Sequence, residues 1–186
     1  MTLKINREKV LDSIYTNVQD RNMIKHMLAV EAIMRALARR LGENEEEWGL
    51  TGLVHDIDVE LVKDDMVAHG RLGADIAREL GASEEMIHAI LCHNEVHGVP
   101  RESRLDKALY CADPLSGLIT AAALVRPEKL TGLTTRSVMK RFREKSFAAG
   151  VNREQVAECR EIGLELEEFI GLGIEAMQGI SSDLEL

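Results

Sequence analysis

The clearest apolar pattern in this chain recurs at steps of four and three residues, at Met23, Met27, Val30, Met34 and Leu37. Such steps place side chains on one face of an α-helix. The pattern therefore predicts an amphipathic helix over residues of about 21–41, ended by Gly42. One face of that helix is expected to lie in a core.

Shorter apolar stripes, bounded by capping residues, predict helices along the rest of the chain. Pro114 falls inside one of them and predicts a kink, because proline donates no backbone hydrogen bond. The last residues are expected to fray. The predicted helices cover residues of about 7–17, from 45 to His55, 69–80, 83–94, 103–125, 134–149 and 165–178, with one more capped by Asn152 and a connecting segment over 57–67.

These elements predict an all-α fold, a single-domain helical bundle over residues 1–186. Hydrophobic residues make up 45% of the sequence and aromatic residues only 3%, so aliphatic side chains must fill the core. We expect the candidate chemistry to lie in a core of about residues 20–126. A C-terminal helical extension would follow over about 127–186.

Charge and cysteine content narrow the function classes. The formal net charge is −9, which disfavours a nucleic-acid polymer as partner but leaves a small anionic substrate open. Cys92, Cys111 and Cys159 form no CxxC pair and are interpreted as small buried residues in a reducing compartment. A polar N-terminal stretch and the lack of a long apolar run predict a soluble, cytoplasmic protein without a membrane partner. Nothing in the sequence fixes an oligomeric state.

Four polar residues fall at positions predicted to face the core: His26, the pair His55 and Asp56, and Asp113. Buried imidazole and carboxylate groups need partners, or they cost several kcal/mol. A core hydrogen bond for His26, or a salt bridge for Asp113, would supply one. A divalent cation would satisfy the whole set, and two histidines with two carboxylates suit Mn, Fe, Co, Ni or Zn better than Mg or Ca.

Two further histidines could extend this set to a second ion. His69 opens one predicted helix and His93 lies near the end of the next. With Asp56 as a bridge, a second ion could sit about 3.5–4 Å from the first. A capping or surface role for each histidine is the alternative. The sequence thus predicts one or two divalent transition-metal ions per chain.

The order of these residues resembles the H…HD…D pattern of the HD-domain superfamily of metal-dependent phosphohydrolases. The string Leu53–Asp58 is similar to the HDIG-type branch, with Asp58 where glycine is usual. The resemblance covers roughly His26 to Asp113, and His69 and His93 resemble the extra histidines of dinuclear members. It implies an all-α fold and hydrolysis of a phosphate ester, often of a nucleotide, by metal-activated water, with His55 and Asp56 as catalytic residues.

Basic residues outside the metal set are candidates for binding the substrate's phosphate. One group lies just before and within the helix that carries Asp113, and a second on the predicted basic helix; a solvated surface is the alternative for both. His88, His97 and Lys63 are the candidates for the general acid that protonates the leaving group. The basic candidates are Arg101, Arg104 and Lys107 in the first group, and Arg136, Lys140, Arg141 and Lys145 in the second.

Three functions remain at this point. The leading one is a phosphohydrolase acting on a small phosphorylated molecule, with a nucleotide as the favoured substrate. A di-iron oxygenase would use the same histidine-rich site, and bound iron with O₂-dependent turnover would favour it. A non-catalytic nucleotide sensor is the third, which full ligand affinity in metal-free protein would favour.

Overall fold

A computed structural model describes residues 4–186 as a set of helices, and that part of the chain contains no strand. The all-α prediction is confirmed. The elements are α1 (Arg7–Asn17), α2 (Arg21–Leu41), α3 (Glu45–Val54), α4 (Val59–Val62), α5 (Arg71–Leu80), α6 (Glu84–His93), the 3₁₀ turn η1 (Glu95–His97), α7 (Arg104–Leu124), α8 (Thr135–Arg143), α9 (Arg153–Ala157), η2 (Glu158–Ile162), α10 (Leu166–Gly179) and α11 (Ser181–Leu184).

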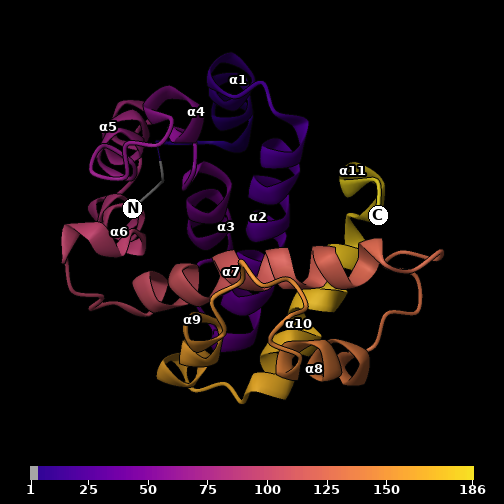
Figure 1. Cartoon of the computed structure of the whole chain (residues 1–186). Coiled ribbons are helices and arrows are strands. Elements are labelled where there is room, and N and C mark those ends of the chain that lie inside the picture. The colour runs from indigo at the N-terminus through magenta and orange to yellow at the C-terminus, as the bar shows by residue number, and fades with distance from the viewer. Residues whose placement is uncertain (1–3) are drawn as a thin grey trace.

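Helix α2 lies at the centre and packs against α3, α7 and α10 (Figure 1). Four of the five residues in its predicted apolar stripe are fully buried, and Met23 is partly buried. Helix α3 approaches closely because it carries Gly52, where a Cβ atom would lie 2.9 Å from the Val30 carbonyl oxygen. This close contact brings the C-terminal end of α3 beside the first turns of α2.

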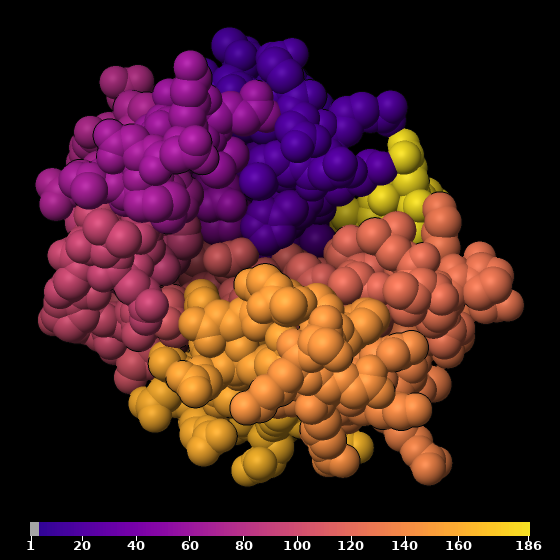
Figure 2. Space-filling view, in the orientation of Figure 1, coloured from indigo at the N-terminus to yellow at the C-terminus, as the bar shows by residue number. Residues whose placement is uncertain are grey.

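Helix α7 crosses α2 and joins the N-terminal helices to the C-terminal ones (Figure 1). Leu115 and Ile119 of α7 press against Gly173 of α10, where a Cβ would come within 2.9 Å of both side chains. One hydrophobic cluster runs from Ile5 to Leu184 through both parts. On the surface, the indigo N-terminal helices and the orange segment of the C-terminal part meet along a furrow above α7 (Figure 2).

Two predicted boundaries around the candidate site are wrong. Helix α5 begins at Arg71 rather than at His69, because Gly70 takes a left-handed backbone angle (φ +83°) that ends the preceding turn. His69 therefore lies in a turn. The segment predicted as a plain connection over 57–67 contains the short helix α4.

The C-terminal part also departs from prediction. Helix α8 ends at Arg143, six residues early, because the guanidinium of Arg153 donates hydrogen bonds to the carbonyl of Phe142 in the last turn of α8 and to the carbonyls of Ala148 and Val151 beyond it. The last residues do not fray: α11 forms there and Leu184 is buried.

Pro114 does not interrupt α7, which continues to Leu124. The carbonyl of Tyr110, which cannot accept a hydrogen bond from Pro114, accepts one from the Gln155 side chain at 2.8 Å. The C-terminal part thereby satisfies the backbone group that the proline leaves without its helical partner.

Candidate metal centre

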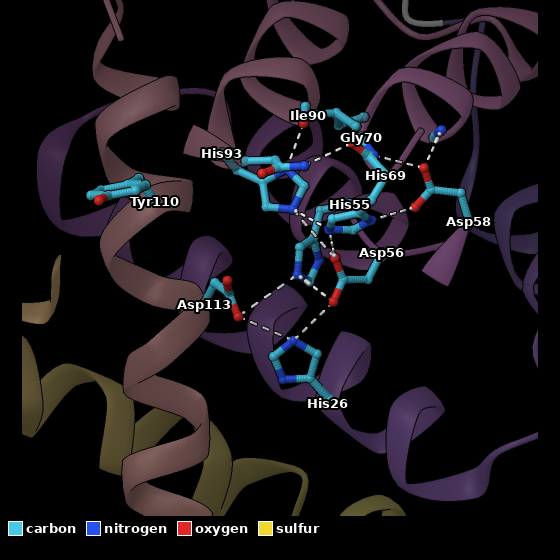
Figure 3. Close-up of polar contacts among 12 residues, drawn as sticks. His26, His55, Asp56, Asp58, His69, Gly70, Ile90, His93, Tyr110 and Asp113 are labelled. Atoms are coloured by element: carbon cyan, nitrogen blue, oxygen red, sulfur yellow. Dashed lines mark hydrogen bonds and ion pairs between the residues drawn. The ribbon is translucent and has the colours of Figure 1, made fainter. Parts of the chain in front are cut away.

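Six residues from five places in the chain converge on one point inside the fold (Figure 3). They are supplied by α2, by the end of α3, by the turn before α5, by the last turn of α6 and by the middle of α7. All six candidate ligands from the sequence belong to the group: His26, His55, Asp56, His69, His93 and Asp113.

The histidine rings are oriented by hydrogen bonds at Nδ1. Ser116 donates its hydroxyl proton to the Asp113 carbonyl at 2.8 Å, so its oxygen is left to accept from His26 Nδ1 at 2.9 Å. His55 Nδ1 donates to the Gly52 carbonyl at 2.8 Å, and His93 Nδ1 donates to a backbone carbonyl one turn back on α6. Fixing Nδ1 in this way leaves Nε2 as the free ring atom.

The four Nε2 atoms point at the carboxylate of Asp56 (Figure 3). Asp56 Oδ2 lies 3.5 Å from His26 Nε2 and 3.4 Å from His55 Nε2. Asp56 Oδ1 lies 3.5 Å from His69 Nε2 and 3.4 Å from His93 Nε2. Each oxygen of one carboxylate therefore faces its own pair of imidazoles.

Asp113 completes the first of these two groups. Its Oδ1 is 3.2 Å from His26 Nε2 and 4.0 Å from His55 Nε2. The first group therefore consists of His26, His55, Asp113 and Asp56 Oδ2, and the second of His69, His93 and Asp56 Oδ1. We call these the first and second half-sites.

The charges in the centre are set by burial and by the close contacts. Burial opposes ionisation of Asp56, yet the neighbouring His55 and hydrogen bonds with His26 and His93 hold its pKa well below the usual range. Burial also opposes protonation of His26, but hydrogen bonds to Asp113 and Asp56 raise its pKa to about 10. Both carboxylates are thus ionised, and His26 carries a proton where a cation would otherwise lie.

His55 behaves differently from His26. Its side chain is fully buried, and burial lowers its pKa. Its Nε2 is buried and has no hydrogen-bond partner among residues 4–186. An unpaired buried nitrogen costs about 1–3 kcal/mol, which makes this atom the clearest sign that a partner is required.

The donor set fits transition-metal ions. Ligands sharing an ion at about 2.0–2.2 Å lie roughly 3–3.5 Å apart, close to the spacings around Asp56. In the second half-site, His69 Nε2 and His93 Nε2 face each other at 3.2 Å, a contact that needs a proton or a cation between the two nitrogens. Imidazoles with two carboxylates and no thiolate suit Mn, Fe, Co, Ni or Zn. Asp113 keeps 28% and His26 21% of its side chain exposed, so the centre is open on that side.

Asp58, which the sequence analysis noted only as a departure from glycine, supports the second half-site. This fully buried carboxylate accepts from His69 Nδ1 at 2.9 Å and from the backbone N–H groups of Gly70 and Gly73 at 2.7 and 2.8 Å. Burial would raise its pKa, but these donors lower it. A Cβ at Gly73 would lie 3.2 Å from Asp58 Oδ2, so this glycine makes room for the carboxylate. The pairing of this aspartate with the downstream His-Gly…Gly string was a signal that sequence reasoning missed.

The other histidines lie outside the centre. His97 Nε2 donates to the His69 carbonyl at 2.7 Å, and Asn94 donates to the same carbonyl at 2.9 Å, so both hold the His69 backbone in place. His88 pairs with Asp106, the residue that caps the start of α7, at 3.0 Å. His88, Asp106 and Cys92 form another cluster of residues that could ligate a metal ion. Asp106 is already engaged there, because its carboxylate accepts from the backbone N–H of Ser103 at the start of α7. Lys63 is exposed at the end of α4.

The basic candidates do not gather at the centre. Arg101 stacks on the Tyr110 ring, with its guanidinium carbon 3.5 Å from the ring centroid, while Arg104 pairs with Glu43 and Lys107 with Glu161. Residues of the basic helix, among them Arg136 and Lys140, line a separate pocket of about 690 Å³ that includes no residue of the centre. Arg141 pairs with Glu144, and Lys145 lies in the turn after α8.

A pocket of about 520 Å³ does adjoin the centre, because His26 is part of its wall. Lys25 from α2, Thr120 from α7 and Lys129 line it further, and the segment Leu184–Leu186 closes one side. No pattern in the sequence marks these residues, because they come from α2, from α7 and the turn after it, and from the C-terminal segment, which only the tertiary structure brings together.

Two remaining sequence predictions concern the whole chain. Each of the three cysteines is buried and free, as predicted, and burial raises the pKa of Cys92 to about 12. Within residues 4–186, no helix combines the length and the apolar character that crossing a membrane requires.

Comparison with known proteins places the centre in a family. The model of the family described as HD domain matches residues 23–118, which contain all six candidate ligands. Ribonuclease Y of Oleidesulfovibrio alaskensis is 35% identical over 103 residues, 55% of this chain and 20% of that protein. Ribonuclease Y of Syntrophobacter fumaroxidans is 35% identical over 103 residues, covering 55% and 19%, and that of Lawsonia intracellularis is 30% identical over 110 residues, covering 59% and 21%. The chain spans about a fifth of the length of these relatives, and no solved structure matches it.

Proposed function

The chain belongs to the HD-domain family, and from this premise we propose that it is a metal-dependent phosphohydrolase that hydrolyses a phosphate ester of a small molecule, most plausibly a nucleotide. The family and its ribonuclease relatives support a metal-dependent hydrolase. That the bond hydrolysed is a phosphate ester, and that the substrate is a nucleotide, are the parts that we propose. The pocket beside His26, about 520 Å³, is in the size range of small-molecule sites.

One observation carries the proposal: four histidines direct Nε2 at the two oxygens of a single buried carboxylate, while every Nδ1 is engaged elsewhere. Hydrogen bonding inside a protein core does not need this convergence. The Nε2 atom of His55 has no partner at all among the described residues. Divalent ions held by these histidines and by Asp56 would satisfy every one of these atoms.

In the proposed mechanism His26, His55, Asp113 and Asp56 would hold one ion, and His69, His93 and Asp56 would hold the other. Bound metal supplies two things, a water molecule that ionises near neutral pH and positive charge to stabilise the phosphoryl oxygens. The chain's own residues fix the geometry. Ser116, Asp58 and the backbone carbonyls orient the rings, and the full burial of His55 excludes bulk water from the inner side.

The open side of the centre sets where the substrate enters. Asp113 and His26 are its most exposed ligands, and His26 also forms part of the adjoining pocket wall. A phosphate ester would therefore place its reacting phosphorus beside Asp113 and His26, with the rest of the molecule in the pocket. His88 and His97 are held by Asp106 and by the His69 backbone, so we do not assign either as the general acid.

The test starts from protein purified without added metal or chelator, with metal identity and stoichiometry determined by elemental analysis. The metal-loaded protein is then assayed for phosphate release from nucleoside mono-, di- and triphosphates and from a simple aryl phosphate. We expect one or two transition-metal ions per chain and turnover that chelation abolishes and metal restores. Metal-loaded protein that releases no phosphate from any of these esters would contradict the proposal.

The alternatives appear as distinct outcomes of the same experiment. Bound iron with O₂ uptake and no phosphate release would point to a di-iron oxygenase. Nucleotide binding that survives complete metal removal would point to a sensor.

The ribonuclease relatives favour one further candidate, cleavage of an RNA phosphodiester. The net charge of −9 opposes a long polyanion, so we rank this function second. Incubating the metal-loaded protein with a single-stranded RNA oligonucleotide and with its constituent nucleotides separates the two. Faster turnover of the oligonucleotide would reverse our ranking.

A further inference from the structure

Three cationic side chains gather around one residue at the edge of the pocket beside His26. Arg21 Nη2 lies 2.8 Å from Glu185 Oε1, and Lys25 Nζ lies 2.6 Å from Glu185 Oε2. Lys129 Nζ donates to the main-chain carbonyl of Glu185 at 2.6 Å. Segments more than 100 residues apart in sequence thus meet around a single glutamate.

The position of this cluster ties it to the candidate metal centre. Lys25 directly precedes His26 on α2, and both line the same pocket of about 520 Å³ together with Lys129 and Glu185. Lys25 is the least exposed of the three cations, with 23% of its side chain accessible to solvent, whereas Arg21 and Lys129 are exposed. A ligand that fills the pocket from His26 outward would reach these cations next.

The charges in the cluster do not balance. One Glu185 carboxylate faces Arg21 and Lys25, and the ammonium of Lys129 meets only a neutral carbonyl of that residue. Lys25, followed by Arg21, lowers the pKa of the Glu185 carboxyl and keeps it ionised. Asp183 shares a neighbouring pocket with Arg21 and Lys25 but forms no ion pair with either within residues 4–186. A phosphoryl group with two charges would match the three cations better than a carboxylate does.

We propose that Arg21, Lys25 and Lys129 form an anion-binding site for a second phosphoryl group of the substrate, and that Glu185 occupies this site until the substrate displaces it. The inference rests on the proposed function and narrows it to phosphate esters that carry another phosphoryl group beyond the one hydrolysed. Glu185 has a left-handed backbone angle (φ +57°), which is unfavourable for a residue with a side chain.

The experiment measures binding, so that it does not depend on turnover. Isothermal titration of the metal-loaded protein with inorganic pyrophosphate compares the natural sequence with Glu185→Gln, which keeps the shape of the side chain and removes its charge. The matched control is Glu168→Gln, which breaks another exposed pair, with Arg40 at 2.6 Å, away from the pocket. We expect Glu185→Gln to tighten pyrophosphate binding roughly fivefold and Glu168→Gln to leave it unchanged.

A second pair of variants tests the cations themselves. Lys129→Met should weaken pyrophosphate binding several-fold without altering the metal content, and in combination with Glu185→Gln it should cancel most of the gain. The inference would be overturned if the pyrophosphate affinities of Glu185→Gln and Glu168→Gln differed by less than twofold, or if Lys129→Met did not change that affinity.

The two proposals can fail separately. A tighter Glu185→Gln variant that hydrolyses no phosphate ester keeps the anion site and rejects the phosphohydrolase. If the protein hydrolyses simple monophosphates but Glu185→Gln leaves pyrophosphate binding unchanged, the phosphohydrolase stands and the anion site is rejected.

Discussion

The two half-sites that share Asp56 are built in different ways. The first draws His26, His55 and Asp113 from α2, the end of α3 and α7, helices that pack directly on one another. In the second, His69 lies in a turn and His93 is the last residue of α6. Packing of the core places the first set, whereas in the second half-site His69 is placed by a network of hydrogen bonds with Asp58, Asn94 and His97.

This difference indicates how each half-site would respond to change. Side chains fixed by helix packing move only if the core moves, so the first half-site should be robust. Side chains fixed by a few hydrogen bonds depend on each supporting residue. The predictions below test that contrast, from the largest expected effect to the smallest.

Removing Asp56 should abolish both half-sites at once. We expect Asp56→Ala to lose all bound metal, a drop in affinity beyond the roughly 10–100-fold typical of losing a group that merely supports a ligand. The helical fold should remain, because the substitution removes a buried charge. Elemental analysis and circular dichroism measure the two quantities, with the exposed Asp64→Ala as control. Full metal content in Asp56→Ala would show that this residue is no ligand.

Removing His69 should affect the second half-site alone. In protein that binds two ions, His69→Ala is expected to keep one, because the four ligand atoms of the first half-site remain. The matched control is His88→Ala, which removes a histidine paired with Asp106 outside the centre and should keep both ions. If His69→Ala lost both ions, the half-sites would not be independent and the contrast between them would break.

Altering Asp58 should weaken the second half-site without removing a ligand. Asp58→Asn puts an amide in a place where three donors already point, so we expect about 10–100-fold weaker binding of the second ion. The expected loss of stability is about 1–3 kcal/mol. The exposed Asp75→Asn, whose carboxylate pairs with Arg78 on the surface, is the control and should change neither quantity.

Acid should erase the stability that Asp58 supplies. Its donors lower its pKa in the folded protein, so its contribution is present above the ordinary aspartate pKa of about 3.9 and is lost as the pH falls through the folded-state value. Urea unfolding of the metal-free protein should therefore show a gap between the natural sequence and Asp58→Asn that is full at about pH 6 and narrows towards pH 3. A gap that widened in acid would contradict this assignment.

Ser116→Ala should have the smallest effect. It removes the oxygen that accepts from His26 Nδ1, but packing of α2 against α7 still holds the ring near its place. We expect a loss of about 1 kcal/mol, or about fivefold in affinity for the first ion, with the second ion unaffected. A loss as large as that of Asp58→Asn would mean that the first half-site relies on hydrogen bonds as much as the second.

The sequence predicted the helices well where packing and capping act locally. The apolar stripe of α2 and the capping residues Asn44 and Ser83 mark real helix boundaries. The errors at α5 and at the end of α8 have a common cause, because distant groups decide those ends. Asp58 accepts from the N–H of Gly70, and Arg153 donates to carbonyls after Arg143. No periodicity in the local sequence encodes such partners.

The sequence by itself singled out the candidate ligands, because polar residues at predicted core positions of a helical chain need a common partner. It could not determine how those ligands are held, nor where the substrate's charge would go. Asp58 and Ser116 act on histidines in other segments. Lys25 and Lys129 both reach Glu185 only after α2, the turn that follows α7 and the end of α11 come together. The identity of a ligand is a property of its own chemistry, whereas its orientation and the pocket around it depend on contacts between residues far apart in the chain.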